Sequence, residues 1–452
     1  DWQAPDDRTV VVAVKRLRGP SSRARLWLIE GGPGGSGLND FPPVMEMWQQ
    51  LDPTLEVLTI DHRGVGYSER LECPDQESSL SMEGSAIALS ETAACAAYLE
   101  QQHPGRLPYF STSQSAYDLA AIVARTNADG TPTYLWGGSY GTYLLHRYLQ
   151  LFPHQANGII LDSINPADVS AYGQAVGMDI AGRALLDVCA AQPSCSSRLG
   201  GDPIGFWQTL LADLDHGHCS QSGVSSATLR LIGTWLGTYR PTNEAVPAIA
   251  YRLRRCSDAD LKAFKRFSQY LTSGWITNLP GFSQALNMNV TSSEMTVSSS
   301  DPALSDEELA QFDRSRLFSL AGVADSLATR KLWPAYTESL DDKWAKSDLP
   351  ILMLQGGLDL LTPAHGARAW REHFKGTAQT YVEFPYGSHG ITWSTPIGES
   401  SGDDCAAQLV LAFTRDPTAK VDASCVGKVK ALDFDGNEAV AAALFGTASL
   451  WD

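Results

Sequence analysis

The first 170 residues alternate between short apolar segments and amphipathic segments, a pattern typical of strands separated by helices. Helical periodicity is clear at Ser115–Arg125 and in the run that begins at Thr142. Strands that alternate with helices predict a mainly parallel sheet with helices on both faces. The segments with the composition of strands are Thr9–Leu17, Arg25–Glu30, Glu56–Ile60, Thr133–Trp136 and Ala156–Leu161.

From Ala171 to about Asp341 the pattern is helical and contains no convincing strand. The serine-rich stretch Thr291–Asp301 is expected to be mobile. Strand pattern returns at Leu349–Leu354 and Thr380–Phe384. We therefore predict a sheet domain in two parts, residues 1–170 and 342–452, with residues 171–341 inserted between them as a helical cap. The helical segments of this cap are Gly182–Ala190, Phe206–Leu214, Ala227–Leu236, Glu244–Arg255, Asp258–Leu271 and a segment that opens with the capping box Ser305-Asp306-Glu307-Glu308.

The formal charge of −17 makes a nucleic-acid partner unexpected, because a phosphate backbone calls for a basic face. An acidic surface attracts cationic ligands, such as peptides with a free amino terminus. No apolar run reaches the length of a membrane span, and no signal peptide is visible at Asp1. If the protein is exported, its signal has already been removed. No pattern in the sequence indicates the oligomeric state.

The chain has eight cysteines and no Cys-x-x-Cys motif. An even number of cysteines in near-neighbour pairs predicts four local disulfides and an oxidising compartment, secreted or periplasmic. Buried free thiols in a cytosolic enzyme are the alternative. The expected pairs are Cys73–Cys95, Cys189–Cys195, Cys219–Cys256 and Cys405–Cys425.

One glycine-flanked serine lies where a predicted strand must turn at once into a predicted helix. Gly137-x-Ser139-x-Gly141 follows the strand at Thr133–Trp136 and precedes the helix at Thr142. Such a turn forces its central residue into a strained backbone conformation, and the flanking glycines remove the Cβ atoms that would clash. Ser139 is therefore the candidate nucleophile, at the positive end of a helix dipole.

The glycine-rich segment Gly31-Gly32-Pro33-Gly34-Gly35-Ser36-Gly37 also follows a predicted strand. Gly32, Gly34 and Gly37 fit the dinucleotide-binding pattern G-x-G-x-x-G, which makes an oxidoreductase a competing hypothesis. That pattern should open a helix, and Pro42-Pro43 argues against a helix directly after the glycines. A loop whose free amides form an oxyanion hole fits better. Gly32 is the first choice as donor, with Gly34 and Gly35 as alternatives, because Pro33 has no N–H.

An acid and a histidine each follow one of the two later strands. Asp359 comes after Leu349–Leu354, and His389 comes after Thr380–Phe384. A serine needs a base within hydrogen-bond reach, and the base needs an acid that fixes its tautomer. His389 is therefore the candidate base and Asp359 the candidate acid, with Asp162 at the end of an earlier strand as the alternative acid. The Tyr140 amide, directly after the serine, is the second oxyanion donor.

With these motifs together, the sequence resembles the α/β-hydrolase peptidases that include the prolyl iminopeptidases and tripeptidyl aminopeptidases. It looks closest to the longer, secreted tripeptidyl-aminopeptidase-like branch. The resemblance implies the triad Ser139, Asp359 and His389, a Cys405–Cys425 bridge and Thr362 as a partner of the acid. The matching segments are Gly31–Gly37, Asp61–Ser68, Gly137–Gly141, Gly357–Pro363 and Gly387–Gly390.

The Asp61–Ser68 loop, which contains an aspartate, an arginine and two glycines, is expected to be a structural loop held by a buried ion pair. No cofactor is expected. No metal is expected either, because His216, His218 and Cys219 lie in one loop without a second ligand pair.

The leading hypothesis is a serine hydrolase that cleaves peptides from the amino terminus through an acyl-enzyme. A carboxylesterase that uses the same triad on small esters is the alternative. An exopeptidase must bind the substrate's ammonium group, and a carboxylate suits this role. Glu30 beside the glycine loop and Glu244 and Glu294 in the predicted cap are the candidates.

Overall fold

A computed structural model describes residues 2, 9–19, 21–81, 86–271, 280–398, 403–435 and 437–452. Within these ranges one seven-stranded sheet has the order β1-β3-β2-β4-β5-β6-β7. β1 is antiparallel to β3, and the other neighbours pair in parallel. The strands are β1 (Ala13–Leu17), β2 (Ala24–Ile29), β3 (Leu55–Asp61), β4 (Thr133–Gly138), β5 (Gly158–Asp162), β6 (Ile351–Gly356) and β7 (Gln379–Phe384).

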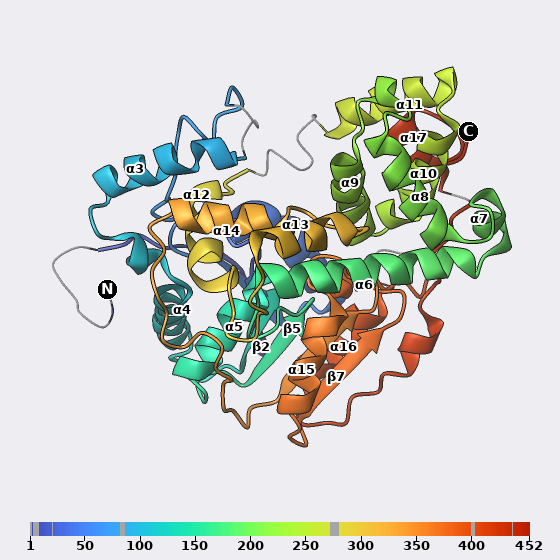
Figure 1. Cartoon of the computed structure of the whole chain (residues 1–452). Coiled ribbons are helices and arrows are strands. Elements are labelled where there is room, and N and C mark those ends of the chain that lie inside the picture. The colour runs from blue at the N-terminus through green and yellow to red at the C-terminus, as the bar shows by residue number, and fades with distance from the viewer. Residues whose placement is uncertain are drawn as a thin grey trace.

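Helices cover both faces of this sheet (Figure 1). Side chains of β2 alternate between the two faces, since successive residues of a strand point to opposite sides. Trp27 and Ile29 are buried with residues of α4, α5 and α15, whereas Leu26 and Leu28 are buried with residues of α2 and α16. The helices outside the predicted cap are α1 (Gly37–Asp40), α2 (Pro42–Leu51), α3 (Thr92–Gln102), α4 (Thr112–Thr126), α5 (Tyr140–Leu151), α15 (Ala364–His373), α16 (Cys405–Arg415) and α17 (Glu438–Phe445).

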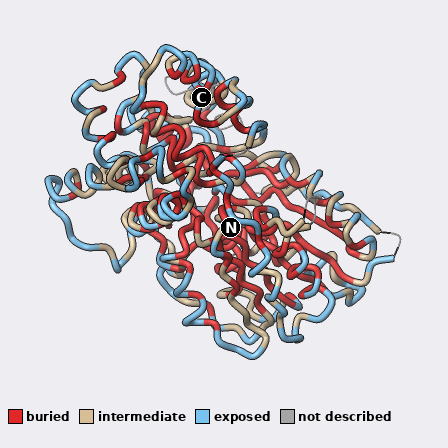
Figure 2. Tube along the Cα trace, turned by 90° about the vertical axis from the view of Figure 1, so that its right-hand side faces the viewer, coloured by how far each residue is buried: buried red, intermediate tan, exposed pale blue. Residues whose placement is uncertain are grey.

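Residues 171–271 form a second helical layer, which we name the cap layer, with its own apolar core (Figures 1 and 2). The long helix α6 runs between the sheet and the other helices of this layer. The helices of residues 171–341 are α6 (Ala171–Ala190), α7 (Pro193–Arg198), α8 (Pro203–Asp215), α9 (Ser226–Thr238), α10 (Val246–Arg255), α11 (Asp258–Tyr270), α12 (Gln284–Val290), α13 (Asp306–Ser315) and α14 (Val323–Leu332).

The end of the chain packs in this helical layer rather than on the sheet. Leu432, Phe434, Leu444 and Trp451 are all buried in the apolar cluster of α6 to α11, and α17 lies against α11 (Figure 1). We predicted from the sequence that these residues belong to the sheet domain. An apolar pattern indicates that a segment is buried, but it does not indicate which of two cores buries it. The boundaries near residues 170 and 341 remain predictions.

The serine-rich stretch Thr291–Asp301 begins as an ordered part of the structure, so the prediction that it is mobile is wrong for its first half. A π-helix at Thr291–Met295 follows α12 directly. Ser292, Ser293, Glu294 and Met295 are buried. Serine-rich composition is typical of loops, but packing against the sheet domain decides the conformation here.

Helices also follow the glycine segment directly, contrary to the expectation from Pro42-Pro43. The Ser36 side chain caps α1 by accepting from Asn39 N at 3.3 Å. α2 then begins at Pro42. Proline is tolerated in the first turn of a helix, because its missing N–H would have no acceptor within the helix there.

Four disulfides join the cysteines in local pairs: Cys73–Cys95, Cys189–Cys195, Cys219–Cys256 and Cys405–Cys425. A bridge of this kind typically contributes about 2–4 kcal/mol to stability. In the part of the chain that the structure describes, no helix is long and apolar enough to span a bilayer.

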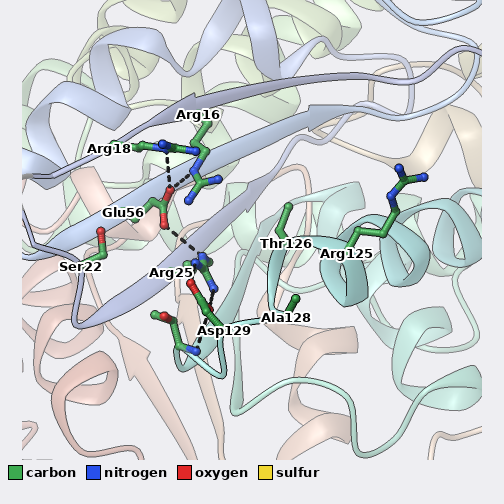
Figure 3. A pocket seen from close by; sticks show the side chains of 10 residues that line it. Arg16, Arg18, Ser22, Arg25, Glu56, Arg125, Thr126, Ala128 and Asp129 are labelled. Carbon is green, nitrogen blue, oxygen red and sulfur yellow. Dashed lines mark hydrogen bonds and ion pairs between the residues drawn. The ribbon is translucent and has the colours of Figure 1, made fainter.

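A surface cavity of about 570 Å³ lies at the amino-terminal ends of β2 and β3 (Figure 3). Arginines dominate its wall, but internal ion pairs use several of them. The buried Glu56 binds Arg16 and Arg25, and Arg25 also binds Asp129 at 2.6 Å. The cluster therefore ties β1, β2 and β3 to the loop before β4.

The buried Arg147 of α5 ties residues 294–341 to the sheet domain. Its guanidinium lies 2.5 Å from Asp341, 3.1 Å from Glu338 and 3.6 Å from Glu294. Burial and the charge of Glu294 raise the pKa of Asp341 to about 7. One cation therefore compensates three carboxylates that would otherwise repel one another.

Arg147→Met should destabilise the protein by about 3–5 kcal/mol, because it leaves buried carboxylates without their cation. Urea unfolding followed by circular dichroism measures the effect. Arg371→Met is the matched control, because Arg371 is exposed and pairs with the exposed Glu372. The control should change stability by no more than about 0.5 kcal/mol. Equal stabilities for the two variants would contradict the structural role of Arg147.

Candidate active site

The carboxyl ends of four neighbouring strands bring the candidate residues to one edge of the sheet. Ser139 follows β4, Asp162 ends β5, Asp359 follows β6 and His389 follows β7. The register pairs Gly138 with Asp162, so β4 and β5 end level with each other. In open α/β sheets this edge, outside the carboxyl ends of the strands, is where ligands bind.

Ser139 lies on a strained turn between β4 and α5. Its backbone has φ 55° and ψ −125°, a conformation that non-glycine residues rarely adopt. A Cβ added at Gly137 would lie 2.6 Å from Gly141 O, and one added at Gly141 would lie 2.4 Å from Ile29 O. Glycine is therefore required on both sides of the serine, for the steric reason that the sequence motif suggests.

His389 and Asp359 form a hydrogen-bonded pair. The Nδ1 atom of His389 lies 3.0 Å from each carboxylate oxygen of Asp359. Thr362 donates from Oγ1 at 2.7 Å and from its amide at 2.9 Å to the same carboxylate. Burial alone would lower the pKa of His389, but the charge of Asp359 and the hydrogen bond to it raise this pKa above its usual value.

Asp162, the alternative acid, does not occupy the position of an acid partner beside the His389 imidazole. Its carboxylate accepts the amides of Ile391 at 2.8 Å and Thr392 at 2.7 Å, which follow His389 in the chain. Its carbonyl accepts the Ser139 amide at 3.0 Å. Burial raises the pKa of Asp162, although these hydrogen bonds oppose the shift. Asp162 therefore links the serine turn to the histidine loop.

The Ser139 hydroxyl faces the glycine segment. A Cβ added at Gly31 would lie 2.8 Å from Ser139 Cβ and 3.4 Å from Ser139 Oγ. Among the described residues, no hydrogen bond joins Ser139 Oγ to His389 Nε2. Catalytic hydrogen bonds are often long or misaligned before substrate binds, so the missing bond does not argue against a role for His389 as the base.

The amides of Gly32 and Tyr140 are free of acceptors within the described ranges. Tyr140 is the first residue of α5, where an amide has no partner inside the helix. Gly32 is exposed, with φ 116°. Of the two alternatives to Gly32, Gly35 already donates its amide to Gly31 O at 3.1 Å, and Gly34 is buried.

Asp61 and Arg63, expected as an ion pair, bind different partners. The Asp61 carboxylate accepts from Ser36 Oγ at 3.0 Å and from the Tyr67 amide at 2.8 Å. Arg63 binds Asp118 of α4 through two hydrogen bonds of 2.7 Å. Asp61 therefore supports the end of the glycine segment, and the buried ion pair in this loop reaches across to a helix instead.

The three candidate glutamates lie in different places. The Glu30 carboxylate accepts from the Gly31 amide at 2.8 Å, close enough for its charge to act on the pKa of His389. Burial raises the pKa of Glu30 to about 7. Glu244 is buried among α10 and the chain end, where it accepts the Asp433 amide at 3.1 Å. Glu294 is enclosed beside Arg147. Of the three, only Glu30 lies beside the histidine.

Two residues from the cap layer contact His389, and no sequence pattern indicated either of them. The Thr238 carbonyl at the end of α9 accepts the His389 amide at 2.9 Å. The Tyr239 ring packs edge-on against the imidazole with 5.9 Å between centroids. Neither residue belongs to a motif, so only the folded structure could place them. No cluster of His, Cys, Asp or Glu suited to a metal ion occurs among the described residues.

Two protein-family profiles match the chain. The alpha/beta hydrolase fold matches residues 25–184, which contain the glycine segment and Ser139. The TAP-like protein family matches residues 323–425, which contain Asp359 and His389. The two matches together cover both parts of the sheet.

Two tripeptidyl aminopeptidases are similar in sequence to part of the chain. Tripeptidyl aminopeptidases of Streptomyces lividans and Streptomyces coelicolor are each 31% identical over 194 residues, 39% of this chain. The matched region spans 36% and 35% of those proteins, so the chain spans about a third of the length of the curated relatives it matches. A thermophilic esterase from Thermogutta terrifontis is 13% identical with a TM-score of 0.38, covering 92% of this chain and 100% of that one. The two profile matches and the two aminopeptidase relatives together support a tripeptidyl-aminopeptidase-like family of α/β-hydrolases for this chain.

Proposed function

We propose that this protein is a serine hydrolase that cleaves peptides from the amino terminus, as its tripeptidyl aminopeptidase relatives are named for doing. The observation that carries the proposal is the hydrogen-bonded pair of His389 and Asp359 at the same sheet edge as the strained Ser139. The four disulfides support an oxidising location, secreted or periplasmic.

The proposed chemistry has two halves. In the first, Ser139 Oγ attacks the scissile carbonyl carbon while His389 Nε2 takes the hydroxyl proton, and Asp359 stabilises the resulting imidazolium. The C–N bond then breaks, and the proton passes from His389 to the leaving amine. In the second half, His389 removes a proton from water, which attacks the acyl ester. The bond between the acyl carbon and Ser139 Oγ then breaks, His389 returns the proton to Ser139 Oγ, and the amino-terminal fragment leaves as a carboxylic acid.

The amides of Gly32 and Tyr140 are the proposed oxyanion donors. Both are fixed by the backbone and lack an acceptor among the described residues. Donors that are held in place before the reaction stabilise the developing negative charge without a cost of reorganisation. Removing one such donor typically costs about 100- to 1000-fold in rate.

Glu30 is the proposed partner of the substrate's ammonium group. Its carboxylate lies beside the reacting centre, whereas Glu244 and Glu294 have internal partners away from it. A pKa of about 7 lets Glu30 take up or lose a proton near neutral pH. An ammonium group that arrives beside it would favour the charged form of the carboxylate.

Ser139→Ala should abolish turnover of peptide anilides while the circular dichroism spectrum stays that of the parent. Loss of a triad nucleophile typically lowers the rate by about a million-fold. A folded variant that keeps more than about one per cent of the activity would remove Ser139 from its role.

Parallel assays of the parent enzyme with nitrophenyl esters decide between peptidase and esterase, since the esterase alternative predicts turnover of the esters alone.

Asp359→Asn should lower kcat by about ten-thousand-fold, because the amide favours the wrong histidine tautomer. The charge of Asp359 raises the pKa of His389, so its removal should lower that pKa. The base acts when neutral, and activity is lost as pH falls through its pKa. The acid limb of the residual pH profile should therefore move to lower pH. An unchanged rate would pass the role of acid to another residue.

Acetylation of the peptide amino terminus should lower kcat/KM by at least about thirty-fold, the lower end of the cost of truncating one partner of a buried charge pair. Because Glu30 loses its proton as pH rises through about 7, the preference for the free amine should grow between pH 6 and 7. Glu30→Gln should abolish this preference and its pH dependence. Glu46→Gln is the control, because it removes the same charge from an exposed position on α2. Equal cleavage of free and acetylated peptides by the parent enzyme would refute the exopeptidase proposal.

A further inference from the structure

Residues 281–287, which we name the clamp segment, hold the glycine segment by direct hydrogen bonds. The side-chain amide of Asn287 donates to the Pro33 carbonyl at 2.7 Å. The backbone amide of Ser283 donates to the Gly34 carbonyl at 2.9 Å. Two successive carbonyls of the glycine segment are thus bound from the same side, by residues about 250 positions later in the chain.

The clamp segment also covers these glycines with an aromatic ring. A Cβ added at Gly34 would lie 2.5 Å from Ser283 O and 3.2 Å from the Phe282 ring. A Cβ added at Gly32 would lie 3.3 Å from the same ring. The glycines therefore leave room for the close approach of Phe282, in addition to allowing their positive φ angles.

The hydrogen bonds of the glycine segment determine the direction of the Gly32 amide. The Gly31 carbonyl and the Gly32 N–H share one planar peptide unit, so that fixing one orients the other. The Gly31 carbonyl accepts from Gly35 N at 3.1 Å. This bond closes a turn, and the two carbonyls held by the clamp segment lie inside that turn. A change at either carbonyl would rotate the peptide units on which the Gly32 amide depends.

The clamp segment is itself fixed to the sheet domain rather than to the cap layer. The buried Glu77 carboxylate accepts the amides of Gln284 at 3.0 Å and Ala285 at 3.3 Å, at the start of α12. It also accepts the Cys73 amide at 2.8 Å, and Cys73 is bonded to Cys95 of α3. Burial raises the pKa of Glu77, but these amides favour its charged form. Glu77 therefore anchors the clamp segment to the part of the sheet domain that carries the Cys73–Cys95 bridge.

We propose that the clamp segment is the positioning element of the oxyanion hole, with Asn287 as the residue that sets the Gly32 amide through the Pro33 carbonyl. This inference rests on the proposed function, because it assigns the support of an oxyanion donor in that same reaction. Asn287 is a positioning residue, since it touches the loop that carries the donor. It should matter more when negative charge develops on the substrate oxygen than when substrate merely binds.

The test compares Asn287→Asp with the parent enzyme and with Gln101→Ala, an exposed change on α3 outside the clamp segment. Aspartate has nearly the shape of asparagine but cannot donate to the Pro33 carbonyl when ionised. Three quantities are measured for each protein. These are kcat and KM on a peptide anilide, the affinity for a peptidyl trifluoromethyl ketone, whose adduct carries an oxyanion, and the rate at which a fluorophosphonate labels Ser139. Melting temperatures are recorded in parallel.

Asn287→Asp should lower kcat by about tenfold or more, less than complete loss of a donor, which costs about 100- to 1000-fold. KM should change by less than about threefold, and ketone affinity should fall by the same factor as kcat/KM. Asn287→Ser, which keeps a hydroxyl donor, should recover part of the loss. Gln101→Ala should resemble the parent, and melting temperatures should agree within about 3 °C.

Several results would overturn the inference. Unchanged kcat and ketone affinity in Asn287→Asp would show that the Pro33 contact does not set the donor. A rise in KM with unchanged kcat would make Asn287 part of a binding wall instead. A large fall in melting temperature, with kinetics that return to normal on cooling, would make its role structural. If fluorophosphonate does not label Ser139 in the parent enzyme, the proposed function and this inference both fail. Equal labelling of parent and Asn287→Asp removes the inference alone.

Discussion

The hydrogen bonds of Asp162 are the interaction on which the whole site depends. Through its carbonyl this residue binds the Ser139 amide, and through its carboxylate it binds the amides of Ile391 and Thr392. The serine turn and the histidine loop come from parts of the sheet domain that are more than 200 residues apart in the chain. Asp162 ends β5, one of the two strands between them, so that strand order and side-chain chemistry together bring the proposed nucleophile and base to one place. A buried carboxylate with several donors can remain charged without a cation.

Local patterns predicted the parts of the site that depend on local geometry. The turn at Ser139 and the strand ends before Asp359 and His389 follow from strand pattern, glycine spacing and chain order. Contacts between distant segments could not be predicted in this way. The clamp segment, the docking of α17 on the cap layer and the pairing of Arg63 with Asp118 depend on which surfaces meet. The prediction of mobility for Thr291–Asp301 failed in the first half of that stretch for the same reason, since composition alone cannot reveal that a segment is packed.

Burial separates the three candidate glutamates more clearly than their sequence positions do. Glu294 is compensated by Arg147, and Glu244 accepts internal donors, so each carboxylate is already used in stabilising the fold. Glu30 has the Gly31 amide as its hydrogen-bond partner, and burial raises its pKa to about 7. A carboxylate that is costly to ionise alone gains most from an incoming cation. Glu30 therefore suits the binding of an ammonium group, whereas the other two suit structural roles.

The proposed function requires that Ser139 becomes acylated by the amino-terminal fragment of a peptide. The most direct measurement mixes the enzyme with a peptide ester, quenches in acid within milliseconds and maps the digest by mass spectrometry. Acid protonates His389, which stops deacylation and preserves the ester. Acylation of Ser139 predicts a mass increase on this residue equal to the amino-terminal acyl fragment, and that mass also gives the length of the fragment released. An unmodified Ser139 during steady turnover, or an adduct on another residue, would contradict the role of Ser139 as nucleophile.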